Sequence, residues 1–159
     1  MRNITLLICV TLITLFITTN LYDCLPYAGL CRTSPYAHRV YYLMLHANIL
    51  HLSLNIYAML TLAFMCNLRS WHLFVGALLA ITIPSGVLGD IPMVGCSTLI
   101  YAMAGIVVAS ESKWKGLAIA NLLVIALQSF FVGFAVLPHL YCFCTGFAVG
   151  FVTSPKFEQ

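Results

Sequence analysis

Long apolar runs alternate with short polar or turn-forming segments along the whole chain. A helix that crosses the ~30 Å hydrocarbon core of a membrane needs about 20 apolar residues. The first run reaches this length between Arg2 and Asp23, and no small-x-small cleavage site follows it, so we interpret it as an uncleaved helix rather than a signal peptide. The runs predict helices over residues 4–22, 40–66, 73–88, 97–109, 116–136 and 139–152.

Composition turns this helical pattern into a prediction of a membrane protein. Hydrophobic residues make up 62% of the chain and charged residues 7%, and the mean hydropathy is +1.03. Soluble domains have about a quarter charged residues, which supply their polar surface. A net charge of +3 without a basic run gives no support for a nucleic-acid partner. We therefore predict one all-α polytopic membrane domain over residues 1–159, with six spans, the lipid bilayer as a partner and no nucleic acid.

The distribution of positive charge predicts the orientation of these spans. Cytoplasmic loops carry an excess of Lys and Arg. Six spans divide the basic residues into two sets, Arg2, Arg69, Lys113, Lys115 and Lys156 against Arg32 and Arg39. Both termini are therefore predicted to be cytoplasmic.

The fourth and sixth runs are short, and each begins with a polar residue that can take part in catalysis. Thirteen residues starting at Ser97 and fourteen starting at His139 rise only ~20 Å. Both side chains would then lie at one depth, about 10 Å below the outer surface, in a water-accessible cavity. Since two residues separate the fifth run from His139, the fifth helix is expected to stop near Phe131, with residues 133–138 as a non-helical flap.

Small residues occupy the faces that would bring these two helices together. Small-xxx-small stripes let helices in a membrane approach closely, although ordinary packing explains the glycines equally well. Tyr101, one turn below Ser97, is placed to support the imidazole of His139. The stripes contain Cys142, Gly146 and Gly150 on the helix of His139, and Tyr101, Ala104 and Gly105 on the helix of Ser97.

The string HANILHLSLN concentrates polar residues in the second run. His51 and Asn55 are four residues apart and share one helix face. His46 does not share it, and we expect it at the mouth of the helix in a structural hydrogen bond. Buried polar side chains in membranes are costly and usually functional, so this string is a candidate site.

Segment 23–39 is the most polar and predicts a loop, because it contains two prolines and a glycine. Its two cysteines, Cys24 and Cys31, could pair in an oxidising compartment or stay unpaired. The other five cysteines are interpreted as small packing residues.

Three motifs together resemble those of rhomboid intramembrane serine proteases. They are HANILHLSLN, GCSTLIYAMAG (from Gly95) and HLYCFCTGFAVG, in the family's order, and the resemblance covers the chain from about Arg39 onward. The serine motif has Thr98 directly after the serine, where the family usually has glycine. The resemblance implies a six-span rhomboid-like bundle with short fourth and sixth helices. It also implies an active site facing the outer side.

The same resemblance implies a role for each motif residue. Ser97 would attack the scissile carbonyl, and His139 would act as general base and then general acid. His51, Asn55 and the backbone N–H of Ser97 would hold the oxyanion. His46 would be structural, Tyr101 would stack on His139, and Gly95, Gly105 and Gly146 would support the motifs. The implied substrates are single-span transmembrane proteins, and no cofactor or metal is implied.

Two alternatives come from other functional classes. One is an inactive rhomboid-like protein that binds transmembrane clients without cutting them. The other is a membrane protein that binds a metal or haem through His46, His51 and His139, because neutral imidazoles are good ligands.

Overall fold

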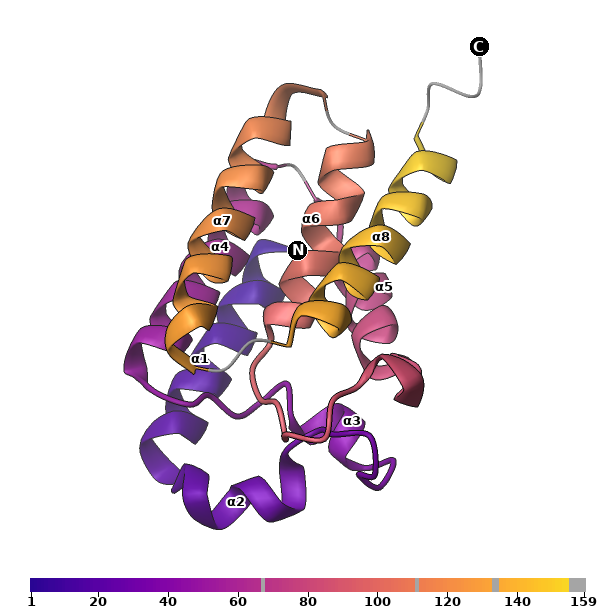
Figure 1. The fold of residues 1–159 in the computed structure, drawn as a ribbon. Helices are drawn as coiled ribbons and strands as arrows, with labels where there is room; N and C mark the ends of the chain where they lie inside the picture. The colour runs from indigo at the N-terminus through magenta and orange to yellow at the C-terminus, as the bar shows by residue number, and fades with distance from the viewer. Residues whose placement is uncertain (67, 111, 133–134, 155–159) are drawn as a thin grey trace.

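The computed structural model describes residues 1–66, 68–110, 112–132 and 135–154, and these form a bundle of α-helices (Figure 1). The all-α prediction is confirmed. Short 3-10 turns lie at η1 (Ser85–Val87) and η2 (Ser112–Trp114). In the described part the α-helices are α1 (Arg2–Thr18), α2 (Leu21–Ala28), α3 (His38–Tyr41), α4 (Ile49–Met65), α5 (Ser70–Ile81), α6 (Ser97–Ser110), α7 (Lys115–Val132) and α8 (Val136–Val152).

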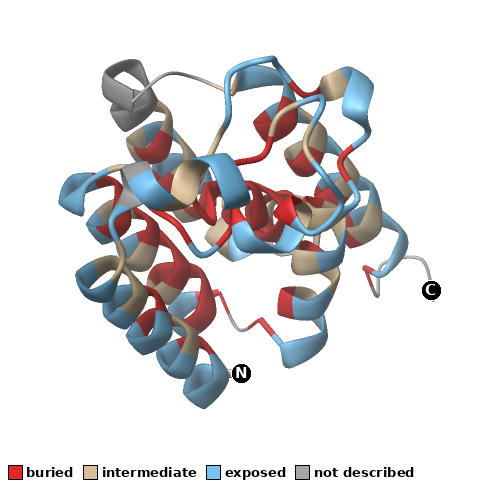
Figure 2. Ribbon diagram, turned by 90° about the horizontal axis from the view of Figure 1, so that it is seen from below, coloured by how far each residue is buried: buried red, intermediate tan, exposed pale blue. Residues whose placement is uncertain are grey.

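Helix α6 forms the centre of the bundle. It packs against α4, α5, α7 and α8, and its contact with α8 is the most extensive in the described part of the chain. Every side chain from Ser97 to Val107 is buried. Figure 2 shows the buried residues gathered in the middle of the molecule, with exposed residues around them. The first residue of α6 is therefore placed inside the protein.

The helix lengths contradict the six predicted membrane spans. Among the described residues, every helix falls short of the length or the hydropathy that a membrane crossing requires. Helices α1, α4 and α8 have 17 residues each. This corresponds to a length of about 25 Å, against ~30 Å of hydrocarbon. The polytopic membrane architecture, the depth of Ser97 and His139 below a surface, the cytoplasmic termini and the outward-facing active site are accordingly wrong predictions.

Some runs are longer than the helices they contain, and in the second run a polar side chain makes the helix begin late. In the second run, the Asn48 side chain accepts a hydrogen bond from the backbone N–H of His51 at 2.8 Å. Asn48 has an extended backbone and is the N-cap of α4, so the helix begins at Ile49 rather than at residue 40. In the first run the helix ends at Thr18, before the run itself ends at residue 22.

Two further boundaries differ from the prediction. Helix α2 occupies part of the segment that was expected to be a loop. Helix α8 begins at Val136, so Pro138 falls in its first turn, where the N–H that proline lacks would have no intrahelical partner. The expected flap is thus helical from Val136, and residues 133–134 lie outside the described part. Helix α7 ends at Val132, one residue beyond Phe131.

The outer faces of several helices are apolar. Leu7 on α1, Phe74 on α5 and Val152 on α8 have exposed fractions of 67%, 70% and 75%. Folded proteins expose single apolar residues routinely, and extended apolar surfaces mark contacts with other molecules. Contact with a lipid bilayer stays a prediction.

Candidate functional site

Ser97 and His139 lie within hydrogen-bonding distance of each other. Ser97 is the first residue of α6, and His139 lies in the first turn of α8. The Ser97 Oγ is 2.7 Å from the His139 Nε2, and the two residues are 5% and 7% exposed. With the imidazole neutral and its proton on Nδ1, the hydroxyl donates to Nε2. The pair has the geometry of a serine beside its general base.

Glycines allow α6 and α8 to approach closely enough for this bond. A Cβ on Gly146 would collide with the carbonyl group of Ala102, and one on Gly105 would collide with the carbonyl oxygen of Phe143. A Cβ on Gly150 would lie 2.5 Å from the carbonyl oxygen of Ile106. The two backbones are in direct contact, which only residues without a side chain permit.

The phenol ring of Tyr101 covers one face of the imidazole. The Tyr101 and His139 rings are stacked, with centroids 4.5 Å apart and an angle of 28° between planes. The Tyr101 hydroxyl donates to the carbonyl oxygen of Leu122 at 3.5 Å, which links the ring to α7. Burial raises the pKa of Tyr101 to about 12. Tyr101 is therefore neutral at pH 7. Its stacked ring restricts the orientation of the His139 imidazole.

Burial keeps the imidazole of His139 neutral. It lowers the pKa of His139 to about 4, and the charge that His51 would carry if protonated lowers it further. A neutral imidazole is the form that can accept a proton from serine. The basic form of His139 is therefore present at neutral pH.

The turn that precedes Ser97 lies against two polar side chains of α4. Gly95 has a φ of +112°, a conformation that favours glycine. A Cβ at this position would lie 2.7 Å from the His51 Nε2 and 3.4 Å from the Asn55 Nδ2. The structure thus brings His51 and Asn55 beside the turn that carries Ser97.

The hydrogen bonding of His51 identifies its proton-bearing nitrogen. The backbone N–H of Ala47 donates to the His51 Nδ1 at 3.4 Å. Burial lowers the pKa of His51 to about 4, so the ring is neutral at pH 7. Because Nδ1 accepts, the single ring proton is on Nε2. His51 therefore presents an N–H donor toward Gly95.

Asn55 is fully buried, at 0% exposure. Among the described residues, neither its amide oxygen nor its amide nitrogen has a hydrogen-bond partner. A buried polar group without a partner costs about 1–3 kcal/mol. Such a group calls for an explanation, and a partner that forms during a reaction is one of them.

His46 lies in the irregular segment before α4 and not in a helix. Its Nε2 is 3.6 Å from the Sγ of Cys96, and its ring meets His51 edge-on with centroids 5.2 Å apart. Burial, with a smaller effect of the His51 charge, lowers the pKa of His46 to about 3. His46 also borders a pocket of about 170 Å³, which is further lined by Phe16, Thr19, Asn20, Met44, Leu45 and Ala47.

Sequence reasoning missed Tyr42, which follows α3 and is 0% exposed. Its backbone oxygen accepts the N–H of Gly95 at 2.8 Å. Its phenol donates to the carbonyl oxygen of Ala80 at 3.0 Å and lies 2.7 Å from the Thr98 Oγ1. Tyr42 is one of several tyrosines and is far from Thr98 in sequence, so no pattern in the chain pointed to this contact.

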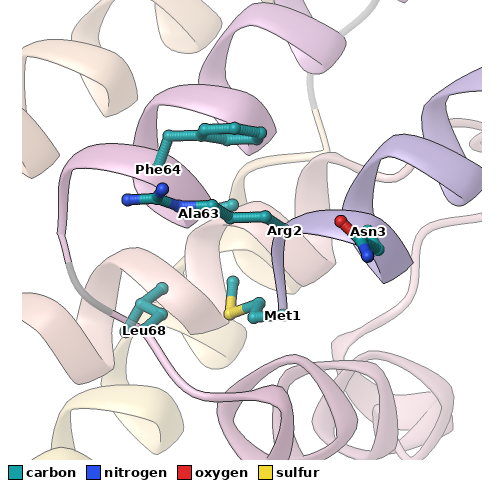
Figure 3. Close-up of a pocket in the computed structure, with 6 residues that line it drawn as sticks. All are labelled: Met1, Arg2, Asn3, Ala63, Phe64 and Leu68. Carbon is teal, nitrogen blue, oxygen red and sulfur yellow. The ribbon is translucent and has the colours of Figure 1, made fainter.

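A second hollow lies between the start of α1 and the end of α4. This pocket of about 430 Å³ is lined by Met1, Arg2, Asn3, Ala63, Phe64 and Leu68 (Figure 3). The Arg2 guanidinium lies 5.4 Å from the centroid of the Phe64 ring. None of the lining residues belongs to the Ser97–His139 pair or to the donors on α4.

The described residues do not support the metal or haem alternative. They contain no group of three or more His, Cys, Asp or Glu side chains placed to hold a metal ion. Cys24 and Cys31 both carry free thiols in this structure.

Comparison with known proteins assigns the chain to no family. No family model matches it, and neither does any curated protein. The predicted membership of the rhomboid family is therefore wrong. The intramembrane endopeptidase and the inactive rhomboid-like binder are rejected with it, because the described helices do not span a membrane.

Proposed function

We propose that the protein is a serine hydrolase in which Ser97 and His139 form a catalytic dyad that acts on ester or amide carbonyls. The observation that carries this proposal is the buried contact of 2.7 Å between the Ser97 Oγ and the His139 Nε2. A serine hydroxyl becomes a nucleophile when a positioned base removes its proton in the transition state. The low pKa of His139 keeps that base unprotonated.

The reaction proceeds in two halves. The Ser97 Oγ attacks the substrate carbonyl carbon, while its proton moves to the Nε2 of His139. The tetrahedral intermediate expels the alcohol or amine, which takes this proton from His139, and an acyl group stays on Ser97. Water then attacks the acyl carbonyl and gives a proton to His139. Collapse of the second intermediate releases the acid and returns the proton to Ser97.

The negative charge of each intermediate would face the start of α6. The first N–H groups of a helix have no intrahelical partner and carry a partial positive charge. The N–H on the His51 Nε2 and the amide of Asn55 lie beside the same turn. A single donor of this kind is worth about 2.7–4 kcal/mol of transition-state stabilisation. The amide of Asn55, which has no partner among the described residues, supports this role, because the oxyanion would be its partner.

Ester and amide carbonyls are the substrate class that this chemistry addresses, and the chemistry needs no cofactor. The expectation that single-span membrane proteins are the natural substrates stays a prediction.

Labelling with a fluorophosphonate tests the proposal, because this probe reacts covalently with activated serines. The wild type, Ser97→Ala and Ser110→Ala are compared, each shown by circular dichroism to be folded. Ser110 is the matched control, since it lies at the other end of α6 and its hydroxyl donates to the carbonyl oxygen of Ile106 in the same helix. We expect the wild type and Ser110→Ala to be labelled, and Ser97→Ala not to be. Labelling of Ser97→Ala, or none in the folded wild type, contradicts the proposal.

A further inference from the structure

Tyr42 connects the end of α5 to both sides of Ser97. Its backbone oxygen accepts the N–H of Gly95 at 2.8 Å, two residues before the serine. Its phenol oxygen is 2.7 Å from the Thr98 Oγ1, one residue after the serine. The phenol also reaches the carbonyl oxygen of Ala80 on α5 at 3.0 Å. One side chain and its own backbone thus hold the turn from two directions.

The directions of these hydrogen bonds follow from the available protons. A phenol has one proton, and the carbonyl oxygen of Ala80 can only accept, so Tyr42 donates to Ala80. The remaining proton is that of Thr98, which therefore donates to the phenol oxygen. Tyr42 is 0% and Thr98 1% exposed, so water does not compete for either bond. A buried hydroxyl that loses its partner costs about 1–3 kcal/mol, so this chain of bonds resists rearrangement.

The turn at residues 95–98 contains groups that must point in defined directions for the proposed reaction. Gly95 has a positive φ and lies against His51 and Asn55. Ser97 must direct its Oγ at His139 and its backbone N–H at the oxyanion. A displacement of about 1 Å in such a group costs about 10²-fold in rate.

We propose that Tyr42 and Thr98 are positioning residues for acyl transfer, which fix the turn at residues 95–98 so that Ser97 faces His139 and the oxyanion site together. This inference rests on the proposed function. Neither residue touches the reacting atoms, and each acts through the backbone of Ser97. The threonine after the serine therefore supports the nucleophile through its hydroxyl group.

Kinetics of three variants test the inference, with a p-nitrophenyl ester and a fluorophosphonate as probes. Tyr42→Phe and Thr98→Val remove the hydrogen bond between the phenol of Tyr42 and the hydroxyl of Thr98. Thr98→Ser keeps the hydroxyl that forms it. Tyr41→Phe is the matched control, because the neighbouring tyrosine is 54% exposed. We expect kcat to fall about tenfold or more in the first two variants, with KM unchanged. Thr98→Ser and Tyr41→Phe are expected to stay within about threefold of the wild type, since they retain the bond.

Hydrogen exchange distinguishes failure of this inference from failure of the proposed function. The amides of residues 95–98 are expected to exchange about tenfold faster in Tyr42→Phe than in Tyr41→Phe, whether or not the protein is active. Wild-type kinetics in Tyr42→Phe and Thr98→Val would overturn the positioning role, and so would an equal loss in Thr98→Ser. An unlabelled wild type overturns the proposed function and the positioning role with it, while the exchange rates still report whether the turn is held. If Tyr42→Phe does not fold, the kinetics of Thr98→Val and Thr98→Ser test the positioning role. A loss of kcat in Thr98→Val alone supports it, and equal kcat values in the two variants overturn it.

Discussion

The two sides of the candidate site differ in how their polar groups are paired. On the α6–α8 side, Ser97 and His139 are joined at 2.7 Å, and Tyr101 stacks on the imidazole. On the α4 side, the amide of Asn55 is buried, and both of its polar atoms are without partners among the described residues. The nucleophile and its base are thus already hydrogen-bonded to each other in the resting protein, whereas the Asn55 amide has no partner among the described residues.

This difference separates two tasks of a hydrolase. A nucleophile and its base must be aligned before the substrate arrives, so their hydrogen bond belongs to the resting state. An oxyanion exists only during the reaction, and donors held for it remain unpaired until then. An unpaired buried amide lowers the stability of the resting protein. On the proposed function, α4 therefore gives up stability for catalysis through Asn55.

Removal of the base is expected to have the largest effect. His139→Ala leaves Ser97 without a proton acceptor, and the hydrolysis rate should fall at least about 10⁴-fold. Steady-state kinetics with an ester substrate measure this. His38→Ala is the control, because His38 is also buried and hydrogen-bonded, to the carbonyl oxygen of Gly29. It should lose stability and keep its rate. A hydrolysis rate in His139→Ala close to that of the wild type would contradict the role of His139 as the general base.

Asn55→Leu should separate activity from stability. We expect kcat to fall about 10²–10³-fold through loss of an oxyanion donor. The free energy of unfolding should stay unchanged or rise by up to about 1–3 kcal/mol, because an unpaired buried amide is replaced by an apolar group of similar size. Kinetics and urea unfolding measure the two quantities.

Asn48, the N-cap of α4, is the comparison for Asn55, because its side chain has a structural hydrogen bond. Its side chain caps α4, so Asn48→Ala should cost about 0.5–2 kcal/mol of stability. If Asn55→Leu loses stability as Asn48→Ala does and keeps its activity, Asn55 has a structural role and the comparison between the two sides fails.

A pair of glycine variants tests the close approach of α6 and α8. Gly146→Ala places a methyl group against the carbonyl of Ala102 and should cost about 1–3 kcal/mol of stability, with a loss of activity as the helices part. At Gly116 in α7, no atom of the described residues lies within 4 Å of where a Cβ would be. Gly116→Ala should therefore be neutral or stabilising by up to about 1 kcal/mol. Thermal unfolding measures both, and equal effects would contradict the proposed packing constraint.

A smaller effect than those of the substitutions is expected in the pH dependence of stability, and it comes from three of the buried histidines, His46, His51 and His139. Burial lowers the pKa of His46 to about 3 and those of His51 and His139 to about 4. Histidine in the unfolded chain has a pKa of about 6.5, so as the pH falls below that value the unfolded state binds protons that the folded state does not. The stability these residues contribute is complete above pH 6.5 and is lost progressively as the pH falls, down to about pH 4 for His51 and His139 and about pH 3 for His46.

Urea midpoints at pH 7, 5.5 and 4.5 measure this loss. In His139→Gln, the free energy of unfolding should fall less between pH 7 and pH 4.5, by the amount that one buried histidine contributes. A stability that does not change across this range would mean that the three rings are not buried in neutral form.

Much of the fold was predictable because apolar runs form helices. The ends of the helices were not, since they depend on single polar groups such as the Asn48 side chain, which starts α4 inside an apolar run. The membrane prediction failed for the same reason. Hydropathy measures the length of a run, and caps and turns set the length of the helix. The family prediction rested on three short motifs, which no match over the whole chain supports.

The candidate site was predictable in part. A serine at the start of one apolar run, a histidine near the start of another and small residues on both suggested that Ser97 and His139 would meet. The spacing of His51 and Asn55 placed both on one face of a helix. No such pattern links Tyr42 to Thr98, because the contact depends on how α3, α5 and α6 meet in three dimensions.

A crystal structure of the protein after reaction with a fluorophosphonate tests the central claim most directly. The phosphorus atom should be bonded to the Ser97 Oγ, and its oxyanion-like oxygen should lie within about 3 Å of the His51 Nε2 and the Asn55 Nδ2. A phosphorus atom bonded to any other residue would contradict the dyad. An adduct on Ser97 whose oxygen points away from His51 and Asn55 would contradict the role of α4.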